Sequence, residues 1–203
     1  MAYDQDLRAI LLEVAADSIA HGLRHGRPLA VDPNAYPEPL RDLRATFVTL
    51  EHCGQLRGCI GVLEASRPLV EDVAQNAFAA AFEDPRFHPL GADEYPEIEI
   101  KVSILTPPEP LVFGSEEELI AQLRPGIDGL ILSDRGHRGT FLPAVWEQLP
   151  EPYAFVEHLK RKAGLPFGYW SDSLKVSRYE TESFGAPTSP HPRALSLGER
   201  GKW

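Results

Sequence analysis

The stretch QLRGCIGVLE, residues 55–64, decides how the centre of this 203-residue chain folds. Each of its glycines would cost a helix about 1 kcal/mol relative to alanine, and the apolar residues around them suit an extended chain, so the stretch predicts a strand. Side chains along a strand alternate between its two faces. Alternation places Leu56 and Ile60 on one face, which we expect to be the core. It places Arg57 and Cys59 together on the other face, toward a cleft or a second layer.

The neighbouring segments build an α+β fold around this strand. Residues 44–54 have a second strand pattern that ends in a polar turn, which predicts an antiparallel hairpin. Residues 97–107, EIEIKVSILTP, alternate so regularly that they predict another strand. Residues 5–23 and 67–82 carry apolar side chains at helical spacing, and each predicts an amphipathic helix.

The second half of the chain continues the mixture. Ser115 begins a capping-box pattern, which predicts a short helix. Residues 126–143 then predict a hairpin, residues 151–165 predict a helix, and residues 172–184 predict a last strand. Hairpins with helices between them favour a largely antiparallel sheet covered by helices, because parallel units would need a helix after almost every strand. The remaining residues, 185–203, are rich in proline, serine and glycine, and they predict a disordered C-terminal tail.

The composition is that of a soluble globular protein, with 43% hydrophobic and 25% charged residues. The net charge of −10 does not favour nucleic acid as a partner, because phosphate binding needs a concentrated basic surface. No apolar run reaches the roughly 18 residues of a membrane span, so we expect a cytoplasmic protein with no membrane partner. The two cysteines, Cys53 and Cys59, are too few for a disulfide framework and are expected to be free thiols.

Several blocks of the sequence resemble the AMMECR family. In chain order they are FVTLEHCGQLRGCIGVLE, PLVEDVAQNAFAAAFEDPRFHPL, IEIKVSILTPPEPL, GIDGLIL, RGTFLPAVWEQLP and LKRKAGLP. LRGCIG is the signature hexapeptide of that family, and the resemblance covers residues 5–184. The departures are modest, since His88 and Ala144 stand where family members often carry other residues and Cys53 falls in a variable turn.

The resemblance implies a fold and partners rather than a reaction. It implies a single domain over residues 5–184, built of a larger and a smaller lobe. Prokaryotic members of the family are called AmmeMemoRadiSam system protein A, so the resemblance also implies association with a Memo-type protein and a radical SAM protein. It implies no cofactor, and it leaves the substrate, the reaction and the oligomeric state open.

Cys59 is the first candidate for chemistry. The thiolate is the nucleophilic form of cysteine, and a guanidinium on the same face, that of Arg57, would favour it. Gly58 and Gly61 would leave room for a ligand or a partner backbone to approach. The alternative is structural: cysteine is often buried as a small hydrophobe, and strand glycines often mark a bulge or close packing. Arg57 would then form an ion pair with a nearby carboxylate.

The loop EDPRFHPL, residues 83–90, is the second candidate. Asp84 and Arg86 flank a proline that stiffens the loop, so they are candidates for binding and orienting a polar substrate near the hairpin. Alternatively, Asp84 caps a turn while Phe87 and Leu90 fill the core.

Two further groups of polar residues are weaker candidates. The segment SDRGHRGT, residues 133–140, gathers three basic side chains around its glycines, and Arg138 is a candidate for holding an anion. A solvated hairpin tip is the simpler interpretation of that segment. His21 and His25 have the i, i+4 spacing of a metal-binding pair but no third ligand beside them, so no metal site is predicted.

Two hypotheses of function follow from these candidates. In the first, the protein is an enzyme or part of an enzyme system, with Cys59 as nucleophile or covalent carrier and Arg57 stabilising the thiolate or an anionic substrate. Asp84 or Arg86 would orient that substrate. In the second, the protein is a non-catalytic binding or adaptor module that docks a Memo-type partner through the LRGCIG hairpin. The rate at which Cys59 is alkylated would separate the two.

Overall fold

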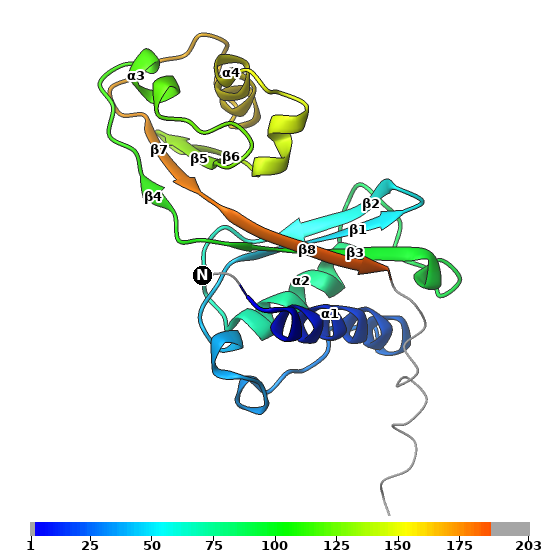
Figure 1. The fold of residues 1–203 in the computed structure, drawn as a ribbon. Coiled ribbons are helices and arrows are strands. Elements are labelled where there is room, and N and C mark those ends of the chain that lie inside the picture. The colour runs from blue at the N-terminus through cyan, green and yellow to red at the C-terminus, as the bar shows by residue number, and fades with distance from the viewer. Residues whose placement is uncertain (1–2, 188–203) are drawn as a thin grey trace, which may run out of the picture. The chain divides into compact units, whose positions relative to one another are not determined.

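The computed structural model describes residues 3–187, and these residues divide into two compact units (Figure 1). The first unit runs to Ile104 and takes in the last strand from Ser183, and the second unit comprises Leu105–Glu182. Each unit has its own four-stranded sheet and its own hydrophobic core. The α+β fold class predicted from the sequence is therefore confirmed.

The first unit packs two helices against one face of its sheet (Figure 1). Its elements are α1 (Gln5–His25), β1 (Thr46–His52), β2 (Gln55–Gly61), α2 (Leu69–Phe82), β3 (Ile98–Leu105) and β8 (Thr181–Pro187), with 3₁₀ turns at Pro33–Ala35, Glu38–Leu40 and Tyr95–Glu97. The strand order is β2-β1-β3-β8, so β2 lies at an edge. The core collects apolar residues from both helices and the sheet, among them Leu11, Val14, Ile19, Val48, Leu50, Val73, Ala77, Ile100 and Val102.

A β-bulge in β2 changes which face of the strand some side chains occupy, relative to the prediction. Leu50 pairs with Gly58 and Glu51 pairs with Leu56, so Arg57 is an extra residue without a partner in the ladder. One extra residue moves the side chain of every earlier residue of the strand to the opposite face of the sheet. Leu56 therefore joins the face of Glu51 and is 45% exposed, and the expectation that it lies in the core is wrong.

The second unit is smaller and is built on the second four-stranded sheet, whose neighbouring strands are antiparallel. Its elements are β4 (Glu109–Pro110), α3 (Glu116–Ala121), β5 (Gly129–Asp134), β6 (His137–Phe141), a 3₁₀ turn (Pro143–Glu147), α4 (Pro152–Lys162) and β7 (Lys175–Tyr179). The strand order is β4-β7-β5-β6. Ser115 caps α3 as predicted, because its hydroxyl accepts a hydrogen bond from the Glu118 N–H at 3.2 Å.

The C-terminal part of the chain departs from the prediction in two ways. The single strand expected over residues 172–184 is two strands, β7 and β8, which belong to different sheets. Strand β8 also continues to Pro187, so the predicted tail would begin inside a strand. The rest of that predicted tail, residues 188–203, lies outside the described residues. Within residues 3–187, no helix has the length and apolar character that crossing a membrane requires.

Candidate functional site

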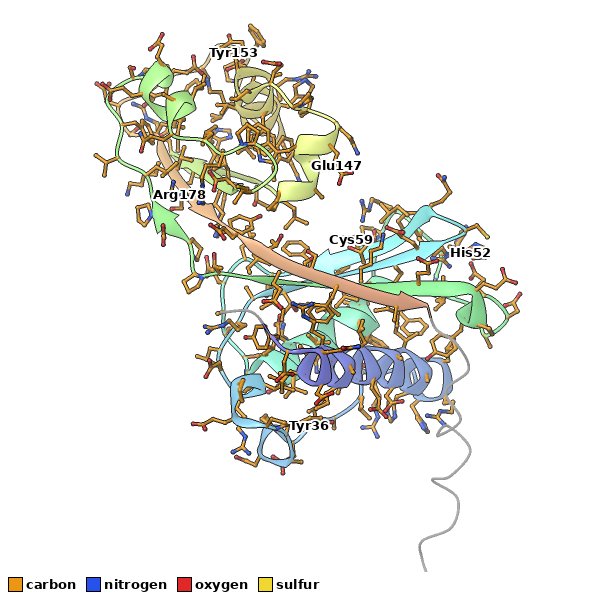
Figure 2. The ribbon with its side chains drawn as sticks, in the orientation of Figure 1. Tyr36, His52, Cys59, Glu147, Tyr153 and Arg178 are labelled. Carbon is orange, nitrogen blue, oxygen red and sulfur yellow. The ribbon has the colours of Figure 1, made fainter. Side chains whose placement is uncertain are left out.

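Cys59 lies on the face of the first sheet that the helices leave uncovered (Figure 2). It stands directly opposite Thr49 on β1, which in turn stands opposite Lys101 on β3. Directly opposed residues share a face, and the neighbours of Thr49, Val48 and Leu50, point into the core on the other side. The thiol is free and half-buried, and its sulfur accepts a hydrogen bond from the Thr49 hydroxyl at 3.3 Å.

Asp84 and Arg86 bind the exposed backbone edge of Cys59. Because β2 is an edge strand, the outward N–H and C=O of Cys59 have no neighbouring strand to pair with. The Cys59 N–H donates to Asp84 Oδ2 at 2.9 Å, and Arg86 Nη2 donates to the Cys59 carbonyl at 3.2 Å. Arg86 also donates two hydrogen bonds to the Asp84 carboxylate, from Nε to Oδ1 at 2.9 Å and from Nη2 to Oδ2 at 2.7 Å. The ion pair thus takes the place of a neighbouring strand at Cys59.

The charges of this ion pair are firmly fixed. The Arg86 guanidinium, together with the N–H groups of Cys59 and Arg86, holds the pKa of Asp84 well below its usual range. The pKa of Arg86 is raised, chiefly by its hydrogen bonds to Asp84 and further by Coulombic attraction from Asp84 and Cys59. Arg86 is therefore a fixed cation that binds the backbone carbonyl of Cys59.

Arg57, which was expected to favour the thiolate, pairs with Glu94 instead. Its Nε and Nη2 donate to the two Glu94 oxygens at 2.9 and 3.0 Å. These hydrogen bonds, with a further one from the Gly91 N–H, lower the pKa of Glu94 to about 2. Among the described residues no hydrogen bond joins Arg57 to the Cys59 sulfur, and the buried Nη1 of Arg57 has no partner. The ion pair considered as an alternative for Arg57 is the arrangement found.

Phe87 links the two arginines. Its ring centroid lies 5.9 Å from the guanidinium carbon of Arg57 and 5.4 Å from that of Arg86. The Phe87 ring is partly exposed and lies between the two guanidinium groups, so Phe87 does not fill the core. Leu90 is buried in the core, as the structural alternative expected.

The two glycines of LRGCIG, Gly58 and Gly61, make room for the protein's own atoms. A Cβ at Gly58 would lie 2.1 Å from the Ala80 carbonyl oxygen of α2, and one at Gly61 would lie 2.4 Å from the Phe47 ring. Close packing accounts for both residues, as the structural alternative proposed. Their predicted part in ligand binding stays a prediction.

Arg138 belongs to the second unit, on β6 opposite Ser133. The turn before it consists of Arg135 (φ 46°) and Gly136 (φ 88°), a two-residue hairpin connection with positive φ at both positions. The hairpin interpretation of residues 133–140 is thus confirmed. The turn lines a shallow hollow with Arg138 and Lys175, and anion binding there stays a prediction.

Sequence reasoning missed three residues of the site around Cys59: Thr49, Phe87 as an arginine partner, and Glu94. It also missed a separate group of potential metal ligands at the β1–β2 turn, namely His52, Cys53 and Glu97. Only the adjacency of His52 and Cys53 was visible in the sequence. Glu97 and Glu94 reach their partners from a loop about 40 residues away, which no local pattern reveals.

Comparison with known proteins places the chain in a family. The family model described as AMMECR1 matches residues 12–184. A protein of Methanothermobacter thermautotrophicus is 37% identical over 176 residues, which cover 86% of this chain and 91% of the relative. Protein MJ0810 of Methanocaldococcus jannaschii is 36% identical over 167 residues, covering 78% of this chain and 80% of the relative.

A solved structure agrees with these sequence matches. The crystal structure of protein PH0010 from Pyrococcus horikoshii superimposes with a TM-score of 0.80 at 33% sequence identity. The match covers 89% of this chain and 92% of that one. The likeness thus extends over both compact units, and not only over the strand that carries LRGCIG. On the family match, the sequence relatives and the shared fold together, this chain belongs to the AMMECR1 family.

Proposed function

We propose that the protein acts through the Cys59 thiol, as a nucleophile or covalent carrier, in an AmmeMemoRadiSam-type system with a Memo-type and a radical SAM protein. One observation carries the proposal: Cys59 is a half-buried free thiol whose sulfur accepts a hydrogen bond from the Thr49 hydroxyl, beside the Asp84–Arg86 pair that binds its backbone. A hydrogen-bond donor at the sulfur favours the thiolate, the form that attacks an electrophile.

The surrounding residues have distinct roles in this proposal. Asp84 and Arg86 are positioning residues, because they fix the Cys59 backbone on both its donor and its acceptor. The Arg86 side chain is 52% exposed, so it also remains available to an anionic group of the substrate. Arg57 supports the loop through Glu94 and Phe87 rather than the sulfur directly. The proposed substrate is thus an electrophile that carries negative charge.

Alkylation of single-thiol variants tests the proposal. Cys53→Ser leaves Cys59 as the one thiol, and Cys59→Ser leaves the exposed Cys53 as an internal reference. With iodoacetamide at pH 7 and a chelator present, we expect Cys59 to react at least as fast as Cys53 although it is less exposed. Thr49→Val should slow Cys59 about tenfold, since a hydrogen bond to a charged acceptor contributes about 1.5 kcal/mol, and should leave Cys53 unchanged.

The opposite pattern would overturn the thiol proposal. If Cys59 reacts more than about tenfold slower than Cys53 and Thr49→Val has no effect, then the hydrogen bond does not activate the sulfur. A matched circular-dichroism spectrum and melting temperature for each variant would show that the rates report the folded protein.

The exposed Leu56 favours a second candidate function, that of an adaptor. An apolar side chain that is 45% exposed beside the turn of a hairpin is a natural anchor for a partner. If the protein is an adaptor that docks a Memo-type protein through this hairpin, Leu56→Asp and Arg57→Ala should each abolish the complex. Cys59→Ser should leave the complex intact. Co-purification of the two proteins measures this directly. A complex that survives Leu56→Asp would exclude the hairpin as the docking surface.

A further inference from the structure

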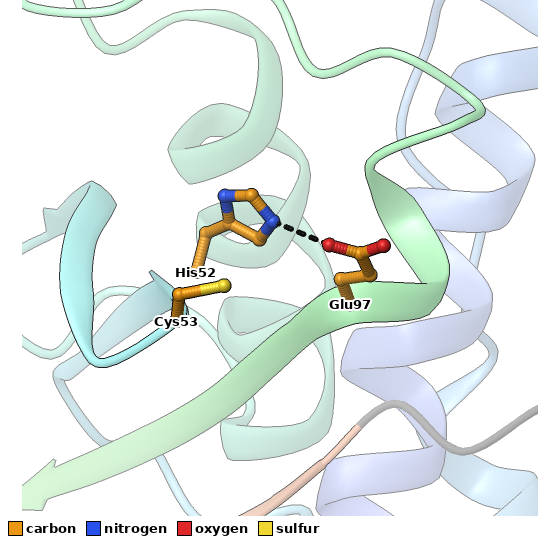
Figure 3. A group of neighbouring side chains, drawn as sticks. All are labelled: His52, Cys53 and Glu97. Carbon is orange, nitrogen blue, oxygen red and sulfur yellow. Dashed lines mark hydrogen bonds and ion pairs between the residues drawn. The ribbon is translucent and has the colours of Figure 1, made fainter.

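Three potential metal ligands converge at the turn between β1 and β2 (Figure 3). His52 ends β1, Cys53 is the first residue of the turn, and Glu97 immediately precedes β3. A nitrogen, a sulfur and a carboxylate oxygen of these residues all lie within 4.8 Å of one another, and His52 Nε2 is 2.8 Å from Glu97 Oε2. Among residues 3–187 this is the one such group of three.

The residue type at position 53 is not explained by the backbone. Cys53 has φ 51° and Gly54 has φ 73°, the positive values of a two-residue hairpin turn. Asparagine, aspartate and glycine suit the first position of such a turn, whereas other residues are disfavoured there. A cysteine in this place exposes its thiol beside His52 and Glu97, where the sulfur can serve as a third ligand.

We propose that His52, Cys53 and Glu97 bind a divalent cation of the zinc class, with the fourth coordination position open to water or to a ligand from a partner. Imidazole, thiolate and carboxylate are the protein ligands of Zn²⁺, and three of them with an open position is an arrangement found in zinc enzymes. A thiolate in the set selects against Mg²⁺ and Ca²⁺, which prefer oxygen ligands. The two anionic ligands balance the charge of the ion.

The geometry requires only small movements to close around the ion. Zinc bonds of about 2.0 to 2.3 Å place tetrahedral ligand atoms roughly 3.3 to 3.8 Å apart. The His52–Glu97 contact would open by about half an ångström, and the sulfur, which lies within 4.8 Å of both partners, would move inward by about one at most. The side chains of His52 and Glu97 are 35% and 65% exposed and Cys53 is exposed, so an ion can reach the three residues from solvent.

This site is separate from the thiol proposed to carry the function, because it uses the other cysteine. It would join the tip of the hairpin to the start of β3, across 45 residues of sequence. Bound metal should therefore raise the melting temperature, since a ligand that binds only the folded state stabilises it.

Titration of the metal-free, reduced protein with Zn²⁺ and with Co²⁺ tests the proposal. Calorimetry should give one Zn²⁺ per chain, and Co²⁺ should produce a thiolate-to-metal charge-transfer band. Cys53→Ser should abolish the band and weaken Zn²⁺ binding by about tenfold or more, whereas the control Cys59→Ser should keep both. Glu97→Gln should weaken Zn²⁺ binding, while Glu99→Gln, two residues along the same strand region, should not.

Three results would each overturn the site. The first is Co²⁺ binding without the charge-transfer band, and the second is Zn²⁺ binding unchanged in Cys53→Ser. The third is loss of Zn²⁺ binding in His21→Asn, which would place the ion on the α1 histidine pair, whose ring centroids are 4.3 Å apart. Thermal melts of every variant without metal would show that the changes arise from ligand loss and not from unfolding.

Discussion

At the residue scale, the identity of Gly58 is set by helix packing. The backbone of α2 approaches β2 so closely that the Ala80 carbonyl oxygen occupies the place where a side chain would begin. Ile60, two residues further along, packs on the same core. Gly58 is thus explained by contact between two elements, without reference to a ligand.

Gly58→Ala should destabilise the protein by about 3 kcal/mol or more, because the added methyl group would lie 2.1 Å from a backbone oxygen that cannot move independently of α2. Urea unfolding measures the loss. Gly114→Ala is the matched control: its Cβ would meet only the flexible Glu118 carboxylate at 3.4 Å, and we expect a change within about 0.5 kcal/mol. Equal stability of the two variants would contradict the packing argument.

The bulge at Arg57 shows where prediction from the sequence fails at this scale. A regular hairpin with its turn at Cys53 and Gly54 would set Cys59 opposite Val48. The extra residue moves Cys59 opposite Thr49 instead, and this creates the hydrogen bond to the sulfur. The alternation of residues 98–105 was predictable because β3 is regular, whereas nothing in LRGCIG fixes where a bulge falls.

At the scale of elements, the loop after α2 completes the sheet edge. The two prolines of EDPRFHPL predicted a loop, and the loop is observed. Its function as a substitute for a neighbouring strand was not predictable, because it depends on β2 being at the edge of the sheet. Asp84 and Arg86 supply one acceptor and one donor, which is what a paired strand would offer Cys59.

Asp84→Asn should destabilise the first unit by about 1.5 to 3 kcal/mol at pH 7, the contribution of hydrogen bonds to a charged group. The pKa of Asp84 is lowered in the folded state, so its stabilisation is complete above the ordinary aspartate value near 3.9. It is lost as the pH falls through the lower folded value. The difference in the free energy of unfolding between the original protein and Asp84→Asn should therefore become smaller below about pH 4.

Urea midpoints at pH 7 and near pH 3 measure this narrowing. Asp93→Asn, a change at an exposed aspartate in the same loop region, is the control and should shift neither midpoint appreciably. If the urea midpoints of Asp84→Asn and the original protein differ by the same amount at both pH values, the ionised carboxylate does not stabilise the edge of the sheet.

At the scale of the whole molecule, each unit has a core of its own, and the second contains a buried charge cluster. Lys160 is fully buried on α4 and donates to Glu157 at 2.6 Å and to Glu116 at the start of α3. Burial alone would lower the pKa of Lys160, but the hydrogen bonds to the two carboxylates outweigh it and raise that pKa. The cluster therefore holds α3 and α4 together within the second unit.

Lys160→Met should destabilise the second unit by about 3 to 5 kcal/mol, because it leaves two carboxylates without their cation. Since the cores are separate, we expect the first unit to be affected much less. Trp146 and Trp170 lie in the second unit, so tryptophan fluorescence in a Trp203→Phe background follows that unit alone. Pulsed hydrogen exchange of peptides from α1, measured by mass spectrometry, follows the first unit.

The two probes should separate in a single urea titration of Lys160→Met, with the fluorescence midpoint falling well below the hydrogen-exchange midpoint. Arg161→Met, an exposed neighbour on the same helix, should leave both midpoints within about 0.5 kcal/mol of the original. If instead both probes shift together in Lys160→Met, the two units unfold as one cooperative body. The chain passes between the units at residues 104–105 and again at 182–183, and these two crossings would then transmit the loss.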